Sequence, residues 1–486
     1  MLYKLSRNTF IREYGPYTYI QNIRSGSDVM FKDAACFFKW LTRTPTDKDE
    51  ILRKIKTEYD VSVSEIENDL NSLIGPLIAQ GWILAGINGN EIDTQDKTDF
   101  SYAEMTGQSD EDVSIIAPSD YKTMPQCILG DYFHQHPTLF DLQLDITQAC
   151  TERCIHCYVP EYAPLFLSYE AVRKVICEFR EMGGLQISFS GGECMMHPEF
   201  DKMLRFAREQ DLIVTVLSNL TLCDEAKAAL LKECSAFVQV SLYSMNPKIH
   251  DGITQREGSW NKTKSAIERL HAADVPMRIS CPTMRQNFDD YLDVLKYAEG
   301  LHISAQTDFI MMAKADHDKS NLDNRLSLEQ TETLLKKIVN ENIPAESEYF
   351  DPKHKDNLKS PEERAEEPLC GAGVDKLCLN ANGNYYPCSG FQDYPVGNCF
   401  EQSLRNVWEN SPRLKHIRGL RGKDIPKCIH CKNRNYCSMC LVRNFNETGD
   451  MLKVADHFCR VAELNREVVE AYHMNLRRKA KSEQRP

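Results

Sequence analysis

Three cysteines stand close together near the middle of the chain, at Cys150, Cys154 and Cys157. Three thiolates at this spacing in one loop can bind three irons of a four-iron cluster. The fourth iron then has no protein ligand, and an open metal position is a catalytic feature. The same spacing suits a zinc knuckle with His156 as its fourth ligand, so the spacing alone leaves both sites open.

Eight more cysteines are concentrated toward the C-terminus, within a total of 19. The N-terminus lacks the apolar core and cleavage site of a secretory signal, which makes metal or redox chemistry a better explanation than disulfides. Two zinc ribbons are one reading of this segment. The eight are Cys370, Cys378, Cys388, Cys428, Cys431, Cys437, Cys440 and Cys459. Cys399 belongs to neither a spacing motif nor an obvious pair.

The elements that position the first cysteines follow a regular rhythm from Phe140 onward. Strands are predicted over Asp141–Ile146, Leu185–Phe189, Leu212–Leu217, Phe237–Leu242, Pro276–Cys281 and Ala305–Met311. Helices are predicted between them over Tyr169–Glu181, Glu199–Glu209, Asp224–Glu233, Ser259–Ala272 and Tyr291–Glu299. This alternation predicts a parallel sheet curved toward a barrel of six units, with the three cysteines at the edge where such barrels hold their sites.

In this setting the three cysteines resemble the signature of the radical S-adenosylmethionine (SAM) enzymes. The resemblance extends to Ser190-Gly191-Gly192-Glu193 after the second strand, Ser218-Asn219 after the third and Ser241 after the fourth. It implies that a low-potential donor of the flavodoxin or ferredoxin type reduces the cluster, which cleaves SAM to a 5′-deoxyadenosyl radical. It further implies SAM contacts from Gly191, Gly192, Glu193, Ser218, Asn219 and Ser241, although strand-end capping is the other reading of the serines.

Two positions depart from the family pattern. Cys194 stands where proline is common. The segment His250–Thr254 resembles one that in many relatives ends in arginine, and here that position is Thr254. Arg256 is the candidate for the missing carboxylate contact.

The C-terminal cysteines, with Gly383 ahead of Cys388, resemble the SPASM extension of these enzymes, which holds two auxiliary four-iron clusters. The resemblance implies one ligand set of Cys370, Cys378, Cys388 and Cys440. It implies a second set of Cys428, Cys431, Cys437 and Cys459, for three [4Fe-4S] clusters in all. Cys437-x2-Cys440 is one residue shorter than the usual spacing, which leaves the interleaving open.

Residues 1–86 carry short strands, a helix near Lys32–Leu41 and two further helical patterns, and they predict a winged-helix module. The second of these patterns begins with a capping box of Ser64 and Glu67, and Pro76 should kink or break it. Within this module, Ile51–Leu84 resembles the PqqD-like peptide-recognition module of ribosomal-peptide tailoring enzymes, which implies that a precursor peptide adds as a strand beside the short sheet. A DNA-binding winged helix is the alternative. Residues 47–69 hold eight acidic and four basic side chains, which disfavours DNA.

The expected fold class is α/β, a partial (β/α)6 TIM-like barrel with an N-terminal winged-helix module and a C-terminal cysteine-rich iron–sulfur domain. The predicted division is 1–86 for recognition, 87–135 for an acidic linker, 136–340 for the barrel, 341–369 for a connecting loop and 370–486 for the auxiliary clusters. A net charge of −13 and the lack of a long apolar run predict no nucleic acid, no membrane and a cytoplasmic location.

Together these patterns predict a radical SAM peptide maturase that forms a thioether or carbon–carbon crosslink in a precursor peptide. A formylglycine-type sulfatase maturase is an alternative, and an iron–sulfur DNA-binding regulator is a more remote one.

Overall fold

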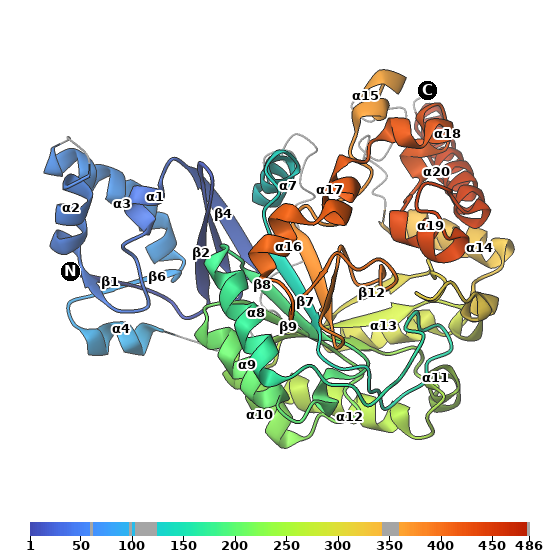
Figure 1. Ribbon diagram of the computed structural model, residues 1–486, viewed down its shortest axis with the longest axis horizontal. Coiled ribbons are helices and arrows are strands. Elements are labelled where there is room, and N and C mark those ends of the chain that lie inside the picture. The colour runs from blue at the N-terminus through green and yellow to red at the C-terminus, as the bar shows by residue number, and fades with distance from the viewer. Residues whose placement is uncertain (59–61, 97–99, 103–123, 343–358, 484–486) are drawn as a thin grey trace.

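The computed structural model describes residues 1–58, 62–96, 100–102, 124–342 and 359–483, and a nine-stranded sheet runs through its centre (Figure 1). The strand order is β12-β11-β10-β9-β8-β7-β13-β14-β15. Six strands in chain order are parallel, as predicted: β7 (Asp141–Asp145), β8 (Gln186–Ser190), β9 (Ile213–Ser218), β10 (Phe237–Ser241), β11 (Met277–Pro282) and β12 (Ser304–Asp308). Their order and direction give the partial-barrel half of the expected fold.

The helices between these strands also follow the predicted pattern. They are α8 (Tyr169–Glu181), α9 (Phe200–Glu209), α10 (Glu225–Glu233), α11 (Pro247–Thr254), α12 (Ser259–Ala272), α13 (Tyr291–Gly300) and α14 (Leu328–Asn342). Two of them, α8 and α12, have the predicted bounds, while α11 was not expected as a helix. Alternate strand residues such as Leu142, Leu144, Val238 and Val240 pack in the main apolar core. The other residues of each strand therefore face the barrel lumen.

The C-terminal part continues the barrel sheet. β13 (Lys376–Asn380) pairs parallel to β7, and β14 (Asn384–Tyr386) and β15 (Gly397–Asn398) follow antiparallel. The remaining described helices of this part are α15 (Pro361–Glu366), α16 (Leu404–Asn410), α17 (Pro412–Gly419), α18 (Pro426–Ile429), α19 (Leu441–Thr448) and α20 (Asp456–Glu483). Leu335 and Val339 of α14 pack with Val468 and Val469 of α20, so the last helix closes against the barrel.

The N-terminal module, blue at the left of Figure 1, contains two small sheets and three helices within its described residues. One sheet joins β1 (Leu2–Leu5), β5 (Thr46–Asp47) and β6 (Ile83–Gly86), and the other is a meander of β2 (Thr9–Tyr14), β3 (Tyr17–Asn22) and β4 (Ser27–Lys32). The helices are α1 (Ala35–Phe38), α2 (Lys48–Lys56) and α3 (Val63–Ala79). The predicted helix from Lys32 to Leu41 is shorter because β4 extends through Lys32, which pairs with Tyr17.

The start of α3 differs from the predicted capping pattern. The capping box is formed by Ser62 and Glu65, two residues before the expected pair of Ser64 and Glu67. Glu67 instead forms an ion pair of 2.6 Å with Lys48 on α2. The helix also continues through Pro76, where the sequence predicts a kink or a break.

The meander of β2, β3 and β4 packs against the end of the barrel at which the parallel strands begin. One of its faces, with Ile11, Ile20 and Phe31, packs toward the module helices. The other face, with Phe10 and Tyr19, packs in an apolar cluster with residues at or just before the starts of barrel strands. Those barrel residues are Phe140, Leu185, Ile213 and Val374. The module therefore sits at the end of the barrel opposite the cysteine loop.

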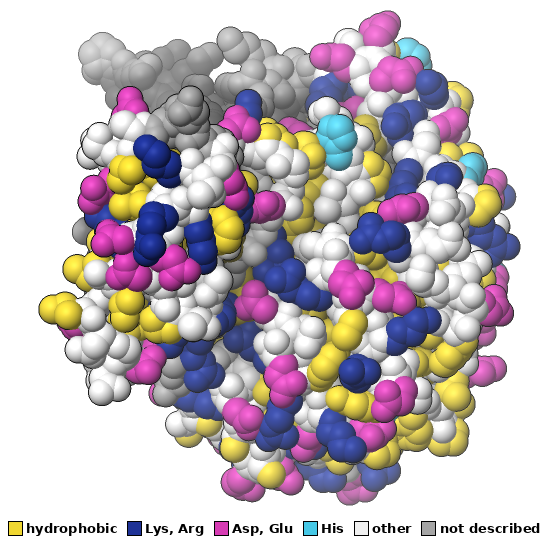
Figure 2. All heavy atoms as spheres, turned by 60° about the vertical axis from the view of Figure 1, so that its left-hand side comes forward, with side chains coloured by type: hydrophobic (Ala, Val, Ile, Leu, Met, Phe, Trp, Pro, Cys, Tyr) yellow, Lys and Arg dark blue, Asp and Glu magenta, His cyan; other side chains and the backbone are white. Residues whose placement is uncertain are grey.

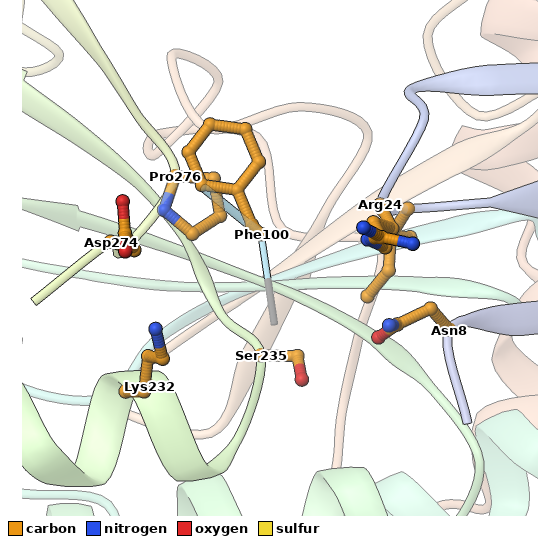
Figure 3. Close-up of a pocket in the computed structure, with 8 residues that line it drawn as sticks. Asn8, Arg24, Phe100, Lys232, Ser235, Asp274 and Pro276 are labelled. Carbon is orange, nitrogen blue, oxygen red and sulfur yellow. The ribbon is translucent and has the colours of Figure 1, made fainter. Parts of the chain in front are cut away.

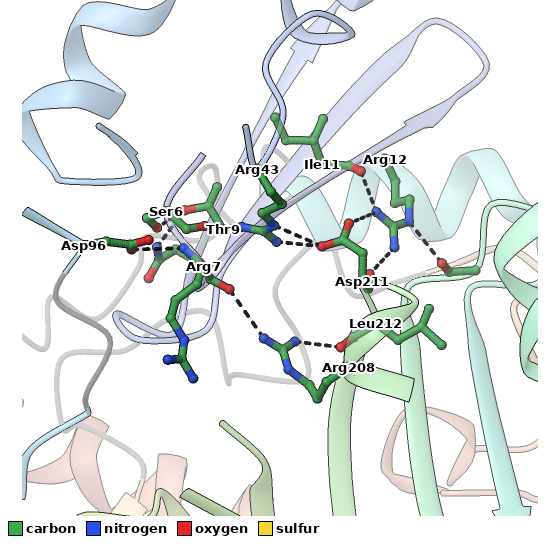
Figure 4. A network of polar contacts seen from close by, with 12 residues as sticks. Ser6, Arg7, Thr9, Ile11, Arg12, Arg43, Asp96, Arg208, Asp211 and Leu212 are labelled. Atoms are coloured by element: carbon green, nitrogen blue, oxygen red, sulfur yellow. Dashed lines mark hydrogen bonds and ion pairs between the residues drawn. The ribbon is translucent and has the colours of Figure 1, made fainter. Parts of the chain in front are cut away.

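A charged cluster joins the module to the barrel (Figure 4). Asp211, in the turn before β9, accepts from Arg12 Nη1 at 3.1 Å and from Arg43 Nη2 at 2.7 Å. Arg12 is 4% exposed and also donates through Nε to Gly184 O at 3.0 Å. Burial alone would raise the pKa of Asp211, but Arg43 and Arg12 hold it below its usual value. We call Arg12, Arg43 and Asp211 the Asp211 clamp.

Beside the clamp, the junction is less tightly packed. Figure 3 shows a hollow between Asn8 and Arg24 on the module side and Lys232, Asp274 and Pro276 on the barrel side. A larger hollow of about 730 Å³ continues toward α3. Polar contacts such as the clamp therefore fix the module in place together with the apolar meander.

The predicted linker 87–135 contains α4 (Gly89–Gln95) and α7 (Pro125–Gln135) in its described parts. Tyr102 anchors it below the barrel, since its N–H donates to Asp274 at 3.0 Å and its hydroxyl donates to Val275 O at 3.1 Å. The acidic stretch from Asn88 to Lys122 predicts a partly disordered linker. Gly89–Gln95 within it is helical, and the rest of this prediction falls largely on residues 97–99 and 103–122, which lie outside the described residues. No helix in the described part of the chain is long and apolar enough to cross a membrane.

Candidate active site

The loop that carries Cys150, Cys154 and Cys157 leaves β7 at the predicted edge of the barrel. Its backbone is bound from two sides. Arg153 N donates to Thr254 O and Ile155 N donates to Ile253 O, each at 2.9 Å, so α11 supports the loop directly. On the other side, Asn324 Nδ2 donates to Ile155 O at 3.1 Å.

The three thiols are free, partly buried and close enough to affect one another. Burial raises the pKa of Cys150 to about 12, with nearby Glu193, Glu152 and Cys157 adding to the shift. Burial also raises the pKa of Cys154 well above its usual value, and the neighbouring Glu152, Cys157 and Cys150 contribute. A cationic metal group would favour the thiolate form that this site otherwise disfavours. The donor set therefore fits an iron–sulfur cluster, although no three His, Cys, Asp or Glu side chains among the described residues are arranged around a single metal ion.

Gly191 and Gly192 bring the backbone after β8 against the backbone after β7. A Cβ on Gly191 would lie 2.3 Å from Thr147 O, and one on Gly192 would lie 2.3 Å from Ala149 O. Gly191 also has φ of +129°, which L side chains rarely adopt. Gly192 N donates to Thr147 O at 2.8 Å. Only glycine permits this approach directly beside Cys150.

Glu193 is fully buried and braces the ends of two strands. Its carboxylate accepts from Ser218 Oγ at 2.9 and 3.0 Å, from Asn219 N at 2.8 Å and from Met195 N at 3.0 Å. Asn219 in turn donates through Nδ2 to Thr151 Oγ1 at 3.0 Å in the cysteine loop. Three of the predicted SAM-contacting residues, Glu193, Ser218 and Asn219, thus form one hydrogen-bonded unit with the cysteine loop.

Ser241 ends β10 on the lumen side. Tyr243, two residues later, reaches the cysteine loop, with its hydroxyl 4.0 Å from Cys154 Sγ. His156 packs its ring edge-on to Tyr243 at 5.0 Å between centroids, and burial lowers the pKa of His156 to about 4. This places the predicted residues of the fourth strand at the same edge as the cysteines.

The departure from the family pattern at Thr254 is explained by α11 (Pro247–Thr254). Thr254 is fully buried, and its Oγ1 lies 2.7 Å from Ser259 Oγ, so it faces α12 and not the lumen. Arg256, the candidate for the carboxylate contact, is exposed just after the helix ends. Neither residue lines the site.

The structure adds a buried carboxylate that the motif search did not select. Asp145, the last residue of β7, faces the lumen and lies 3.4 Å through Oδ2 from Cys378 Sγ on β13. Burial raises the pKa of Asp145. Period-two alternation along β7, counted from Leu142 and Leu144, is the signal that identifies it. It links β7, the strand that leads into the first cysteine loop, to one of the C-terminal cysteines.

The C-terminal cysteines separate into two neighbourhoods. Burial raises the pKa of Cys388 to about 12, and nearby Cys440 and Cys370 add to the shift. The pKa of Cys378 is raised by burial, by Asp145 and by Cys388. In the second neighbourhood, burial raises the pKa of Cys428, and nearby Cys431 and Cys459 add to the shift. Burial likewise raises the pKa of Cys437, with Cys428 and Cys459 adding to it. Each neighbourhood contains cysteines of one predicted ligand set, and their role as cluster ligands stays a prediction.

The two unassigned cysteines lie in the main apolar core. Cys194 is fully buried, with its Sγ 3.5 Å from Leu217 O, and Cys399 is 3% exposed. Both pack as small apolar side chains.

Two family models match the chain. Residues 144–298 match the radical SAM superfamily, and residues 370–440 match the SPASM iron–sulfur cluster-binding domain. Among curated relatives, the antilisterial bacteriocin subtilosin biosynthesis protein AlbA of Bacillus subtilis (strain 168) is 24% identical over 327 residues, which cover 64% of this chain and 69% of AlbA. The AdoMet-dependent heme synthase of Methanosarcina barkeri (strain Fusaro / DSM 804) is 23% identical over 333 residues, 64% of this chain and 93% of that enzyme.

The crystal structure of Streptococcus suis SuiB bound to its precursor peptide SuiA has the same fold. The TM-score is 0.59 at 15% sequence identity, with 94% of this chain and all of SuiB covered. The cysteine loop, the braced glycine motif and the two family matches lead to one conclusion: the chain contains a radical SAM domain over residues 144–298 and a SPASM iron–sulfur cluster-binding domain over residues 370–440.

Proposed function

We propose that this enzyme modifies a ribosomally made precursor peptide by radical chemistry. The single observation that carries the proposal is the combination of the cysteine loop at one end of the barrel with a separate module at the other end that presents an open strand edge. SAM cleavage alone needs only the first of these.

Cys150, Cys154 and Cys157 would hold a four-iron cluster whose open iron binds SAM. When bound, the cluster supplies the electron that converts SAM to a 5′-deoxyadenosyl radical able to remove a hydrogen atom from the peptide. The chain's own residues orient the ligand. Gly191 and Gly192 allow close approach, the Glu193, Ser218 and Asn219 unit fixes the strand ends, and Ser241 offers a polar contact.

Cys370, Cys378, Cys388 and Cys440 would hold one auxiliary cluster, and Cys428, Cys431, Cys437 and Cys459 a second. Four protein ligands close each cluster to substrate, so we assign them electron transfer and support of the fold. They would accept the surplus electron when the peptide forms a thioether or carbon–carbon crosslink. A flavodoxin- or ferredoxin-type donor would reduce the first cluster, in a cytoplasmic setting.

The peptide would bind along β4. In the described residues no strand pairs with the outer edge of β4. Asp33 N donates to Pro16 O at 2.7 Å, which makes Asp33 and Pro16 a hydrogen-bonded pair. Because such pairs alternate in an antiparallel ladder, the N–H groups of Asp28, Met30 and Lys32 point to the open edge. A peptide strand can add there through main-chain bonds.

A DNA-binding role for the module has less support. Figure 2 shows Lys and Arg side chains interspersed with Asp and Glu over the face that includes the module. Several of its lysines are paired with carboxylates, among them Lys48 with Glu67 and Lys54 with Glu50. DNA binding needs a continuous basic surface that phosphates can reach.

The relatives also include a heme synthase, which makes a tetrapyrrole substrate the second candidate. The strand edge on β4 favours the peptide, since a tetrapyrrole has no backbone to pair with a strand. A sulfatase-type maturase, the alternative enzyme, also acts on a peptide. The chemical change found in the peptide will distinguish this activity from formation of a crosslink.

Co-expression of the chain with short peptides encoded beside its gene tests the proposal. A crosslink that forms as a thioether or carbon–carbon bond should lower the peptide mass by two hydrogens, as seen by mass spectrometry. Met30→Pro removes one outward N–H and should weaken peptide binding, while Val29→Ala keeps the edge intact as a control. Peptide binding that survives Met30→Pro unchanged would contradict the role of β4.

A further inference from the structure

Among the described residues, the one arginine at a lumen-facing strand position of the barrel has no anionic side chain as an ion-pair partner. Met277 and Ile279 of β11 pack in the apolar core, so Arg278 between them faces the lumen. It lies opposite Gln239 of β10 and Ser304 of β12 in the parallel register. At the lumen-facing positions of β7 to β12, all of which are described, Arg278 is the only Lys or Arg.

The protein gives Arg278 a neutral neighbour only. One terminal nitrogen donates to Gln239 Oε1, while Nε is buried and has no hydrogen-bond partner. The fully buried arginines differ: Arg12 binds Asp211, and Arg325 binds Glu447. Arg278 is half-buried, and a guanidinium partly removed from water without a counter-ion gains from a ligand that supplies the negative charge.

The position of Arg278 relates it to the SAM edge. Ser241 and Ser280 form the next register pair toward the cysteine loop, so Arg278 lies one layer below them. The long side chain of arginine can reach a ligand that rests on that layer. Thr254 faces α12 and Arg256 is exposed, so neither supplies a positive charge to the lumen.

We propose that Arg278 is a carboxylate-binding residue of the barrel lumen. Its planar guanidinium matches a carboxylate through two parallel hydrogen bonds. Two ligands expected there carry this group, the methionyl part of SAM and an acidic residue of the peptide, and the second source rests on the proposed function.

The experiment compares Arg278→Gln with Arg278→Lys and with the surface control Arg256→Gln in the reconstituted holoenzyme. Equilibrium binding is measured for SAM and for decarboxylated SAM, which keeps the sulfonium and the nucleoside. If SAM is the ligand, Arg278→Gln weakens SAM binding about tenfold or more and leaves decarboxylated SAM unchanged. Arg278→Lys should recover part of the loss, and Arg256→Gln should have no effect.

The second arm uses a peptide that the wild-type enzyme modifies. If the carboxylate belongs to the peptide, Arg278→Gln leaves SAM binding unchanged and raises the KM for the peptide. Asp→Asn or Glu→Gln substitution in the peptide should then reproduce the loss in the wild-type enzyme and add nothing in the variant.

The proposal is overturned if Arg278→Gln changes neither SAM affinity nor peptide KM. Should that variant not fold, the wild-type enzyme and the Arg278→Lys variant are compared instead. The proposal is then rejected if both bind SAM and decarboxylated SAM equally well and if neither responds to loss of the peptide carboxylates. Because SAM binding is read without peptide, failure of the peptide function would leave the first arm interpretable.

Discussion

At the scale of single residues, Gly192 beside the cysteine loop has little freedom to change. A Cβ on Gly192 would also lie 2.7 Å from Ala149 C and 2.8 Å from Gln148 O, all backbone atoms that move only with the cysteine loop. We predict that Gly192→Ala displaces Cys150 and lowers 5′-deoxyadenosine formation at least tenfold, while the far-ultraviolet circular dichroism stays native. Gly252→Ala is the control, because a Cβ there meets nothing within 4 Å. Equal activity of the two variants would contradict this prediction.

The site residues differ in how far the sequence reveals them. Cys150, Cys154, Cys157 and the glycine motif are found from local spacing, since ligands of one group must lie close together. The lumen-facing residues Asp145 and Arg278 need strand alternation, and their importance depends on what the other strands place nearby. Their partners lie far away in the sequence, so spacing alone cannot identify them.

At the scale of elements, α11 determines what the site can use. Its carbonyls at Ile253 and Thr254 support the cysteine loop, and Thr254 is buried against α12. We predict that Thr254→Arg, which restores the residue common in relatives, destabilises the protein by several kcal/mol because it buries a charge without a partner. SAM affinity should not improve. Glu257→Arg puts the same side chain at an exposed position and should be neutral.

Denaturant unfolding of the Thr254→Arg and Glu257→Arg variants measures the predicted loss of stability, and SAM titration measures their affinity for SAM. A stable Thr254→Arg enzyme with tighter SAM binding would show that the segment is able to rotate toward the lumen.

Elements with strong periodicity were predictable, and those set by distant pairing were not. The bounds of α8 and α12 could be predicted because apolar residues recur at helical spacing within each segment. The predicted helix at Lys32–Leu41 was too long because Lys32 is held by pairing with Tyr17 on β3. The addition of β13 to β7 could not be seen, since a five-residue strand carries little signal of its partner.

At the scale of the whole molecule, the Asp211 clamp sets how the module meets the barrel. Asp211 reads as an ordinary turn residue in the sequence, and only the fold brings Arg12 and Arg43 to it. Asp211→Asn should loosen β2 from the barrel at a cost of about 1–2 kcal/mol, a modest figure because the side chain is one-third exposed. Hydrogen exchange should be faster in Thr9–Tyr14, and Asp289→Asn at an exposed position is the control.

The same clamp should depend on pH. The folded-state pKa of Asp211 is held below its usual value, so its contribution is present at neutral pH and is lost as pH falls below about 4. Exchange in β2 that is the same in Asp211→Asn and the wild type at pH 7 would show that the apolar meander alone holds the module.

The most direct test of the central claim is 5′-deoxyadenosine formation by the anaerobically reconstituted chain with SAM and a strong reductant. The wild-type enzyme should hold roughly twelve irons and form 5′-deoxyadenosine, whereas replacement of Cys150, Cys154 and Cys157 by Ala should leave roughly eight irons and abolish the product. Continued 5′-deoxyadenosine formation by that variant would contradict the assignment of the SAM-cleaving cluster to these three cysteines.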